Sequence, residues 1–470
     1  MNDELKIKNN ELGGKMNYRY RNDEEMKDSG VEWIGKIPIQ WKVKRVKHIF
    51  ELKKERSDID NPVILSLTQK GIKVRDISNN EGQIAASYLG YTKIAKNDFV
   101  LNPMDLLSGY IDKAEIEGVI SPAYTTFAKK RKVKIIHDYY KQYFQMHYHH
   151  NFLFPWGEGV SFEHRWTLKN ETFLNLPVIE PCVLEQEKIS KFLDVKTAQF
   201  DSIISKKEAL IEKLEEAKKS LISEVVTGKV KVVKTNDGYE LVERKKEEMK
   251  DSGVEWLEDI PKEWDLKRSN YVFKFSKGLS ITKENLQDEG IPCINYGEIH
   301  SKYGFEVNPK RHKLKCVTEE YFNSNPNALI KYGHFVFADT SEDIQGCGNF
   351  SYLNAEDSIF AGYHTIIVRP IKTVSSRYLA YLFDSDDWRI QIRTKVSGIK
   401  VFSITQSILK TTKVILPTLS EQKLIVDYLD NKFVNINSMI NNMKKQIEKL
   451  KEAKQSLISE AVTGKIEILD

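Results

Sequence analysis

The segment MKDSGVEWIGKIPIQW, which begins at Met26, returns as MKDSGVEWLEDIPKEW from Met249. A second segment is repeated as clearly, because AKKSLISEVVTGKV begins at Ala217 and AKQSLISEAVTGKI begins at Ala453. Between each opening motif and each closing motif the two halves barely resemble one another. The order of opening motif, variable block and helix therefore occurs twice. A shared frame around divergent inserts predicts two equivalent docking surfaces and two different binding domains, whereas simple drift of a duplicated domain should erode both parts.

Two long helices are predicted at corresponding places in the halves. Residues 185–226 contain no proline or glycine, and they end at Thr227-Gly228, a helix-stop signal; the second copy ends at Gly464. Apolar residues recur on one a/d heptad frame in each helix. The frame holds Ile189, Leu193, Phe200, Ile203, Leu210, Leu214, Ala217 and Leu221, then Ile425, Leu429, Ile436, Met439, Met443, Leu450, Ala453 and Leu457, with Lys196, Lys207, Lys432 and Gln446 as polar interruptions. We expect the two helices, each about 60 Å long, to pair antiparallel. Packing on a partner subunit or dimerisation through the seam are the alternatives.

Composition limits the class of protein. The chain has 470 residues, of which 40% are hydrophobic, so several packed domains are expected. The N-terminal residues are polar, and no apolar run is long enough to span a membrane. The cysteines show no CxxC spacing, so we expect a reduced, cytoplasmic protein without a structural zinc site. The net charge is +5, and Lys and Arg exceed Asp and Glu in two blocks, 42–175 and 265–415. Two basic blocks favour two polyanion sites, although chance scatter of lysines would look similar.

Short β-branched and aromatic runs mark both variable blocks as mixed α/β or mostly β domains. Examples are Val63–Leu67, Lys132–Ile136 and Thr365–Val368. The combination of frame and blocks resembles the specificity (S) subunits of type I restriction-modification enzymes over about 26–470. The resemblance is carried by ILSLTQKGIKVRD from Ile64, YTKIAKNDFVLNPMDL from Tyr91, GVISPAYTTF from Gly118, EGIPCINYGEIH from Glu289, FADTSED from Phe337, SGIKVFSITQSIL from Ser397, LPVIEPCVLEQEKISKFLD from Leu176 and LPTLSEQKLIVDYLD from Leu416.

The resemblance implies an α+β fold: two target recognition domains separated by two long antiparallel coiled-coil helices, with a pseudo-two-fold internal repeat. Its segments are an N-terminal extension (1–25), recognition domain 1 with its opening motif (26–175), a central helical region (176–248), recognition domain 2 (249–415) and a distal helical region (416–470). The implied partners are double-stranded DNA with a bipartite target, two methyltransferase subunits and two restriction subunits. The chain itself is expected to hold no cofactor and no catalytic site, while the partners use S-adenosylmethionine, ATP and Mg²⁺.

A domain that reads duplex DNA needs cations for phosphates and polar side chains for base edges. In the first block the candidates are Thr68, Gln69, Lys70, Arg75, Lys129, Lys130, Arg131, Arg165 and Thr167. In the second block they are Lys277, Ser280, Thr282, Asn295, Tyr296, Thr340, Ser341, Lys395, Ser397, Lys400 and Ser403. The run from Lys129 to Lys132 suits phosphates better than bases. For each residue the alternative is an ordinary polar surface position, and Trp166 and Phe402 fit core packing better than base stacking.

Three other interpretations compete with a DNA-specificity protein. Asn102-Pro103-Met104-Asp105 faintly resembles an amino-methyltransferase motif, but it lacks the second proline and the aromatic residue. The acidic residues of FADTSED could belong to a nuclease, and His147, His149 and His150 could bind a metal, yet no partner ligand has suggestive spacing. A stand-alone methyltransferase or nuclease is thus the first rival. A coiled-coil scaffold without DNA affinity is the second.

Overall fold

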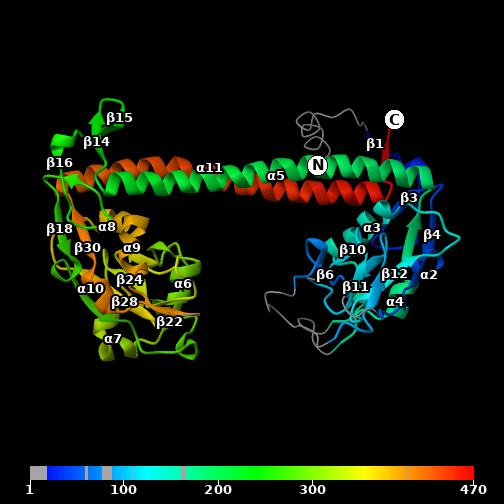
Figure 1. Ribbon diagram of the computed structural model, residues 1–470, viewed down its shortest axis with the longest axis horizontal. Coiled ribbons are helices and arrows are strands. Elements are labelled where there is room, and N and C mark those ends of the chain that lie inside the picture. Colours follow the sequence, from blue (N-terminus) through cyan, green and yellow to red (C-terminus); the bar gives the residue numbers. More distant parts are fainter. Residues whose placement is uncertain are drawn as a thin grey trace. The chain divides into compact units, whose positions relative to one another are not determined.

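The computed structural model describes residues 18–58, 62–76, 87–107, 110–159, 166–398 and 400–469 (Figure 1). The chain divides into two compact units. Unit 1 comprises Met1–Glu208 and Lys444–Asp470, and unit 2 comprises Ala209–Met443. The two longest helices, α5 (Val183–Val226) and α11 (Leu419–Val462), each contribute one part to either unit. The prediction of a mixed α/β chain with long helices is confirmed.

Unit 1 is built on an antiparallel four-stranded sheet in the order β10-β9-β12-β5. Its strands are β5 (Phe50–Leu52), β9 (Phe99–Leu101), β10 (Ile111–Lys113) and β12 (Thr125–Lys129). Helix α3 (His137–His149) covers the sheet, and Phe50, Phe99, Phe127 and Phe144 meet between them with ring centroids 5.2–5.9 Å apart. The predicted β run Lys132–Ile136 contains no strand, because it is the turn and extended lead into α3.

Smaller strand pairs complete unit 1. They are β2 (Met26–Asp28) with β3 (Lys36–Pro38), β4 (Lys42–Arg45) with β13 (Pro177–Glu180), β6 (Leu65–Thr68) with β7 (Gly71–Val74), and β8 (Thr92–Ile94) with β11 (Gly118–Ile120). Short helices α2 (Val46–Ile49) and α4 (Asn170–Asn175) lie beside one another. Apart from β13, these elements lie within residues 26–175, the first variable block with its opening motif.

Unit 2 contains two sheets around two further cores. The five-stranded sheet has the order β19-β28-β24-β26-β21, and the four-stranded sheet has the order β22-β20-β27-β23. The first holds β19 (Phe273–Lys277), β21 (Phe305–Val307), β24 (Phe335–Ala338), β26 (Phe350–Leu353) and β28 (Thr365–Pro370). The second holds β20 (Ile291–Ile294), β22 (Lys315–Val317), β23 (Leu329–Ile330) and β27 (Ile359–Ala361). The remaining strand pairs are β16 (Met249–Lys250) with β17 (Ile260–Pro261), β18 (Asp265–Arg268) with β30 (Lys413–Leu416), and β25 (Thr340–Ser341) with β29 (Phe402–Ser403). The helices are α6 (Tyr296–Ser301), α7 (Glu320–Ser324), α8 (Ser376–Asp384), α9 (Asp386–Arg393) and α10 (Gln406–Thr411).

The repeated opening motif makes the same anchoring contact in both units. Trp41 is fully buried in unit 1 and donates from Nε1 to Glu185 Oε2 at 2.8 Å. Trp264 is fully buried in unit 2 and donates to Glu421 Oε2 at the same distance. Both glutamates lie in the first turn of a long helix. The repeat seen in the sequence is therefore also a repeat of tertiary contacts.

A strand pair follows each closing motif. In unit 2, β14 (Val230–Thr235) pairs with β15 (Gly238–Glu243) as a hairpin in which Val230 lies opposite Glu243. In unit 1, β31 (Ile466–Ile468) pairs with β1 (Tyr18–Tyr20), so that Ile466 lies opposite Tyr20. Val230 and Ile466 occupy the same place after Thr-Gly-Lys. The two ends of the chain thus form the pair that consecutive strands form in unit 2.

The long helices contact one another in antiparallel sense within each unit. In unit 1, Lys454 Nζ donates to Asp201 at 2.7 Å, and Lys207 Nζ donates to Gln446 Oε1 at 2.7 Å. Lys207 and Gln446 are two of the predicted polar interruptions, and their hydrogen bond accounts for a polar pair in the seam. In unit 2, Lys218 Nζ donates to Asn437 Oδ1 at 3.1 Å.

Candidate functional site

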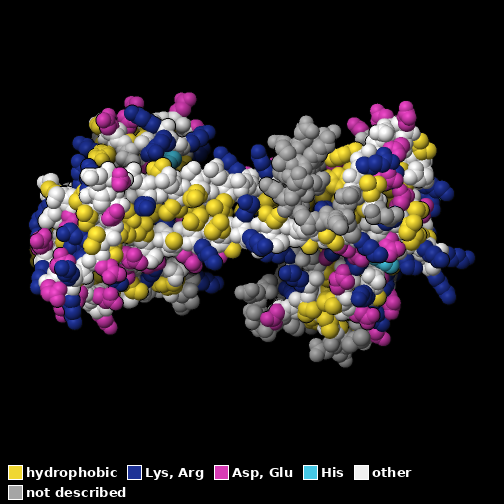
Figure 2. Space-filling model, turned by 90° about the horizontal axis from the view of Figure 1, so that it is seen from above, with side chains coloured by type: hydrophobic (Ala, Val, Ile, Leu, Met, Phe, Trp, Pro, Cys, Tyr) yellow, Lys and Arg dark blue, Asp and Glu magenta, His cyan; other side chains and the backbone are white. Residues whose placement is uncertain are grey.

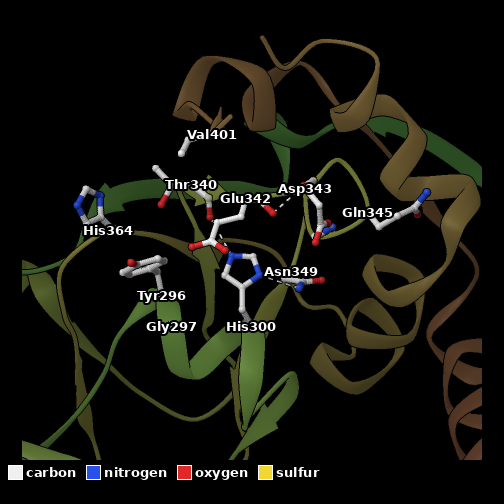
Figure 3. Close-up of a pocket in the computed structure, with 12 residues that line it drawn as sticks. Tyr296, Gly297, His300, Thr340, Glu342, Asp343, Gln345, Asn349, His364 and Val401 are labelled. Atoms are coloured by element: carbon white, nitrogen blue, oxygen red, sulfur yellow. Dashed lines mark hydrogen bonds between the residues drawn. The ribbon is translucent and has the colours of Figure 1, made fainter. Parts of the chain in front are cut away.

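Unit 2 has a pocket of about 720 Å³ beyond the end of β24, the central strand of its five-stranded sheet (Figure 3). Its floor includes β25, which pairs with β29 so that Thr340 faces Ser403. Tyr296, the first residue of α6, and His364, which follows β27, form one side of the pocket in Figure 3. The lining comprises Tyr296, Gly297, His300, Thr340, Ser341, Glu342, Asp343, Gln345, Gly346, Asn349, His364 and Val401.

A chain of hydrogen bonds fixes the back of this pocket. Arg389 Nη1 donates to Asn349 Oδ1 at 2.7 Å, and an arginine can only donate. The amide nitrogen of Asn349 must therefore face His300 Nδ1, 2.9 Å away, which accepts. His300 then carries its proton on Nε2 and donates to the carbonyl of Thr340 at 2.8 Å. Burial lowers the pKa of Arg389, and Asp384, 2.9 Å from the guanidinium, opposes that shift.

The loop after β25 presents two carboxylates with different surroundings. Asp343 Oδ1 accepts from the backbone N–H of Gly346 at 2.6 Å, and the Asp343 carbonyl accepts from Ser341 Oγ at 2.8 Å, so this residue shapes the turn. Glu342 is exposed, and within the described part of the chain its carboxylate has no hydrogen bond or ion pair. In Figure 3 the side chain of Glu342 lies between Tyr296 and His300. Glu342 is thus the carboxylate left available to a ligand.

Five of the residues predicted in the second block gather at or beside this pocket. Tyr296, Thr340 and Ser341 line it, Ser403 pairs with Thr340, and Ser397 bridges to Ser403. Ser341 is only 4% exposed, and Phe402, on the partner strand, is half-buried as core packing requires. Sequence reasoning thus found the β25–β29 edge of the site.

The other predicted residues of this block lie elsewhere. Lys400 is exposed next to Val401 at the rim, and Lys395 is exposed with its Nζ bound to Thr411 Oγ1 at 3.0 Å. Lys277, Ser280 and Thr282 are exposed on the segment that leaves β19.

Asn295 is occupied by internal bonds. It is 2% exposed, its Nδ2 donates to Glu298 at 3.2 Å, and its Oδ1 accepts from the backbone of Tyr363 at 3.2 Å. We therefore leave Asn295 out of the site.

Sequence reasoning missed most of the pocket's remaining lining. Gly297 and His300 follow Tyr296 in α6, within the motif EGIPCINYGEIH, but Asn349 and His364 come from segments distant in sequence, so no local pattern connects the group. Glu342 and Asp343 had a signal, because FADTSED leaves a buried strand as a polar run. The sequence predicts DNA contacts for Thr340 and Ser341 of that run, but it offers the acidic residues only as a possible nuclease site. In the described residues, no group of three or more His, Cys, Asp and Glu side chains could hold a metal ion.

In unit 1 the predicted residues form separate groups. Thr68, Gln69 and Lys70 are exposed at the turn between β6 and β7, and Arg75 is half-buried just after β7. Thr68 Oγ1 donates to the carbonyl of Gly71 at 2.9 Å, which fixes that turn.

The basic run lies at the end of β12. Lys129 and Lys130 are half-buried, Arg131 is exposed, and Lys129 Nζ donates to the carbonyl of Val133 at 3.4 Å. Thr167 forms a bridge with Glu158, whereas Arg165 lies outside the described residues.

A loop like that of the unit 2 pocket follows β9 in unit 1. Asp105 forms a parallel bridge with Trp166, whereas β25 pairs antiparallel with β29, and each loop follows a buried inner strand of its sheet. Tyr148 OH donates to the carbonyl of Asn102 and holds the loop start, while Met104 and Leu107 are exposed. Trp166 donates from Nε1 to the Phe154 carbonyl at 2.7 Å, as expected for a packing residue. The two unlike blocks therefore present a loop at corresponding places.

The helices of the described residues include none that is long and apolar enough to cross a membrane. Figure 2 shows hydrophobic side chains among the charged ones on the surface of the helix pair. The exposed apolar side chains of the long helices in unit 2 include Leu210, Val434 and Met439, which are 46%, 68% and 55% exposed. Such patches are typical of surfaces that contact another protein.

Comparison with known proteins agrees with the sequence-based family. Residues 261–449 match a family model described as "Type I restriction modification DNA specificity domain". The chain is 23% identical over 388 residues to the type I restriction enzyme MjaVIII specificity subunit of Methanocaldococcus jannaschii, covering 80% of this chain and 83% of that one. It is 22% identical to the EcoKI specificity subunit of Escherichia coli K12 over 44% of each chain.

A solved structure shares the fold. It is described as "Structural basis underlying complex assembly and conformational transition of the type I R-M system", and its TM-score is 0.64 at 15% identity, with 91% of this chain and 98% of that chain covered. The matches support the family predicted from the repeat and its motifs: this chain is a relative of the specificity subunits of type I restriction-modification enzymes.

Proposed function

We propose that this chain is the DNA sequence-specificity subunit of a type I restriction-modification complex. Residues 26–175 and 249–415 would each read one half of a bipartite double-stranded DNA target. The carrying observation is the duplicated frame, in which Trp41 with Glu185 and Trp264 with Glu421 anchor two blocks of unlike sequence. Two domains that are anchored in the same way but differ in sequence suit a protein in which each domain reads a different DNA half-site.

The helices are the proposed site of assembly. Two methyltransferase subunits would dock on the two copies of the frame, and two restriction subunits would join through the complex. The apolar side chains exposed on the helices, such as Leu210 and Met439, support a protein contact there. The antiparallel contacts of α5 and α11 support the proposal that the helix pair spaces the recognition domains.

Catalysis is assigned to the partners in this proposal. The methyltransferase subunits would bind S-adenosylmethionine, and the restriction subunits would use ATP and Mg²⁺, while this chain supplies DNA recognition. Purified chain incubated with DNA and these cofactors is expected to show no turnover. Methylation or cleavage by the chain alone would support the stand-alone enzyme instead.

A block exchange tests the assignment of one half-site to each domain. Replacing residues 42–175 by the matching block of a relative should change one half of the methylated motif and leave the other half unchanged. The readout is methylome mapping in a host that carries the chain with its partner subunits. A swap that changed both halves, or neither, would contradict the proposal.

A further inference from the structure

The pocket of unit 2 offers hydrogen-bond acceptors within the block, 249–415, to which the proposed function assigns the reading of one half-site. Its described lining includes the carboxylates of Glu342 and Asp343, the hydroxyls of Thr340 and Ser341, and the amide of Gln345, and it includes no lysine or arginine. A phosphate would meet carboxylates here instead of the cations that bind it. The pocket therefore suits a group that donates hydrogen bonds, and among the parts of DNA such groups are found on the bases.

Only some base edges carry such a group in the major groove. Cytosine presents its N4 amino group there and adenine its N6 amino group, whereas the guanine and thymine edges present acceptors. A carboxylate that accepts from cytosine N4 is an established kind of pairing, and a glutamine can pair with adenine. The chemistry shared by the two fitting bases is an exocyclic amino donor.

Glu342 is placed to accept from this donor. Its carboxylate has no bond to the described residues, while Asp343 is engaged by the backbone of Gly346. The strand that precedes it is held on one side by Ser403 and Phe402 and on the other by His300, through the carbonyl of Thr340. The backbone that carries Glu342 is therefore held in place, which reduces the conformational freedom lost when the side chain binds and favours discrimination between bases.

We propose that this pocket reads a base with an exocyclic amino group in the half-site bound by residues 249–415, with Glu342 accepting the amino hydrogen bond. The inference rests on the proposed function. Lys400, which is exposed next to Val401 at the rim, carries the complementary charge for a flanking phosphate. The pocket thus separates base reading from backbone binding.

The test combines one substitution with one base change. Glu342→Ala removes the accepting carboxylate, and Glu356→Ala is the matched control, since Glu356 is exposed in the same unit and outside the pocket lining. With the partner subunits present, Glu342→Ala should relax the methylated motif at one base pair of one half-site. Affinity for the original target should fall about 5- to 150-fold. Glu356→Ala should match the wild type.

DNA duplexes that lack one amino group provide the second arm of a double-mutant cycle, in which the protein and the base are changed separately and together. Replacing cytosine by 2-pyrimidinone, or adenine by purine, at the relaxed position should weaken wild-type binding by a similar factor and leave the Glu342→Ala variant nearly unaffected, because that variant has no acceptor to lose. The position where the effect occurs distinguishes cytosine from adenine. Equal losses in both proteins, an unchanged motif, or an even loss of affinity for all sequences would overturn the inference.

The two levels of the proposal fail separately. If the wild-type complex recognises no bipartite target, the proposed function is wrong. If it recognises one and Glu342→Ala keeps both motif and affinity, only the role of the pocket is wrong. Thermal unfolding of the variant, expected to match the wild type because Glu342 is exposed, excludes misfolding as the cause of a loss.

Discussion

At the scale of single residues, the frame is held by polar bonds that the repeat itself could not reveal. A buried tryptophan needs an acceptor for its N–H, and Trp41 and Trp264 find theirs in Glu185 and Glu421. The tryptophans were visible as a repeated motif, but their partners lie 144 and 157 positions away. Sequence periodicity reports neighbours along an element and not contacts at such distances, which is also why His300 and Asn349 were missed.

His147 gives unit 1 a pH dependence of stability. The ring is 4% exposed, it bonds to the Tyr143 carbonyl at 2.8 Å, and burial lowers its pKa to about 4. In the unfolded chain the pKa returns to about 6.5, so the unfolded state binds the proton first. Stability is therefore full above about pH 6.5 and falls as the pH drops from there toward 4, by about 1 kcal/mol at pH 5.5.

The comparison of His147→Gln with the wild type isolates this contribution, since other histidines titrate equally in both proteins. Urea unfolding at pH 7.5 and 5.5 should show a smaller loss of stability in the variant. Equal losses would mean that His147 is protonated in the folded protein.

Lys129, Lys130 and Arg131 are expected to act through charge alone. Converting all three to alanine should weaken specific and non-specific DNA binding alike. The slope of log affinity against log salt should become shallower by about one unit for each phosphate that the variant no longer binds. Lys36→Ala, which removes a lysine 2.8 Å from Asp23 in the same unit, is the control. Anisotropy titrations across a salt series give the slopes. An unaltered slope would mean that these three residues contact no phosphate and belong to the ordinary solvated surface.

At the scale of elements, the long helices were predicted well but their seam is broader than the heptad frame. Leu193, Phe200 and Leu429 are buried as predicted, yet Leu210 and Met439 are exposed. The buried positions Ile204, Phe433, Ile440 and Ile447 lie one residue beyond the frame. An a/d stripe describes two helices that contact only each other, whereas these helices also contact the recognition domains and need a wider apolar face. Strands were predicted less well from local sequence. Lys132–Ile136 has β-forming residues but leads into a helix, because the packing of α3 against the core outweighs the local preference of this segment.

Adjacent residues of α11 test this seam. Ile440 is 4% exposed and Met439 is 55% exposed, so Ile440→Ala should reduce the free energy of unfolding by about 2–5 kcal/mol. Met439→Ala should change it by less than about 0.5 kcal/mol. Chemical denaturation followed by circular dichroism measures both. A larger loss of stability for Met439→Ala than for Ile440→Ala would mean that the seam follows the strict heptad frame.

At the scale of the whole molecule, the sequence was most informative, because a repeat reports architecture directly. The two opening motifs, the two closing motifs and the two long helices all recur at corresponding places in the structure. The variable blocks could not be predicted in the same way. Their sheets differ, with one four-stranded sheet in unit 1 against a five-stranded and a four-stranded sheet in unit 2, although a loop follows a central strand in each. Two different half-sites would require two domains that differ in their cores and still present a loop at a corresponding place.

The pairing of β1 with β31 makes the chain equivalent to a ring that has been cut once, at one of two matching hairpins. Moving the chain ends from one hairpin to the other should therefore change the stability of the protein little. A circular permutant would begin at Asp237 and end at Asn236, with a copy of residues 233–240 joining Ile468 to Tyr18 in place of 469–470 and 1–17. This peptide reproduces the register of β14 with β15, so the new junction is expected to form a hairpin. With the partner subunits, the permutant should methylate the same motif as the parent, while a permutant opened between Val336 and Phe337, inside a buried strand, should not fold. A permutant cut in the hairpin that unfolds or changes its motif would show that the position of the ends matters, and that the ring has a fixed starting point.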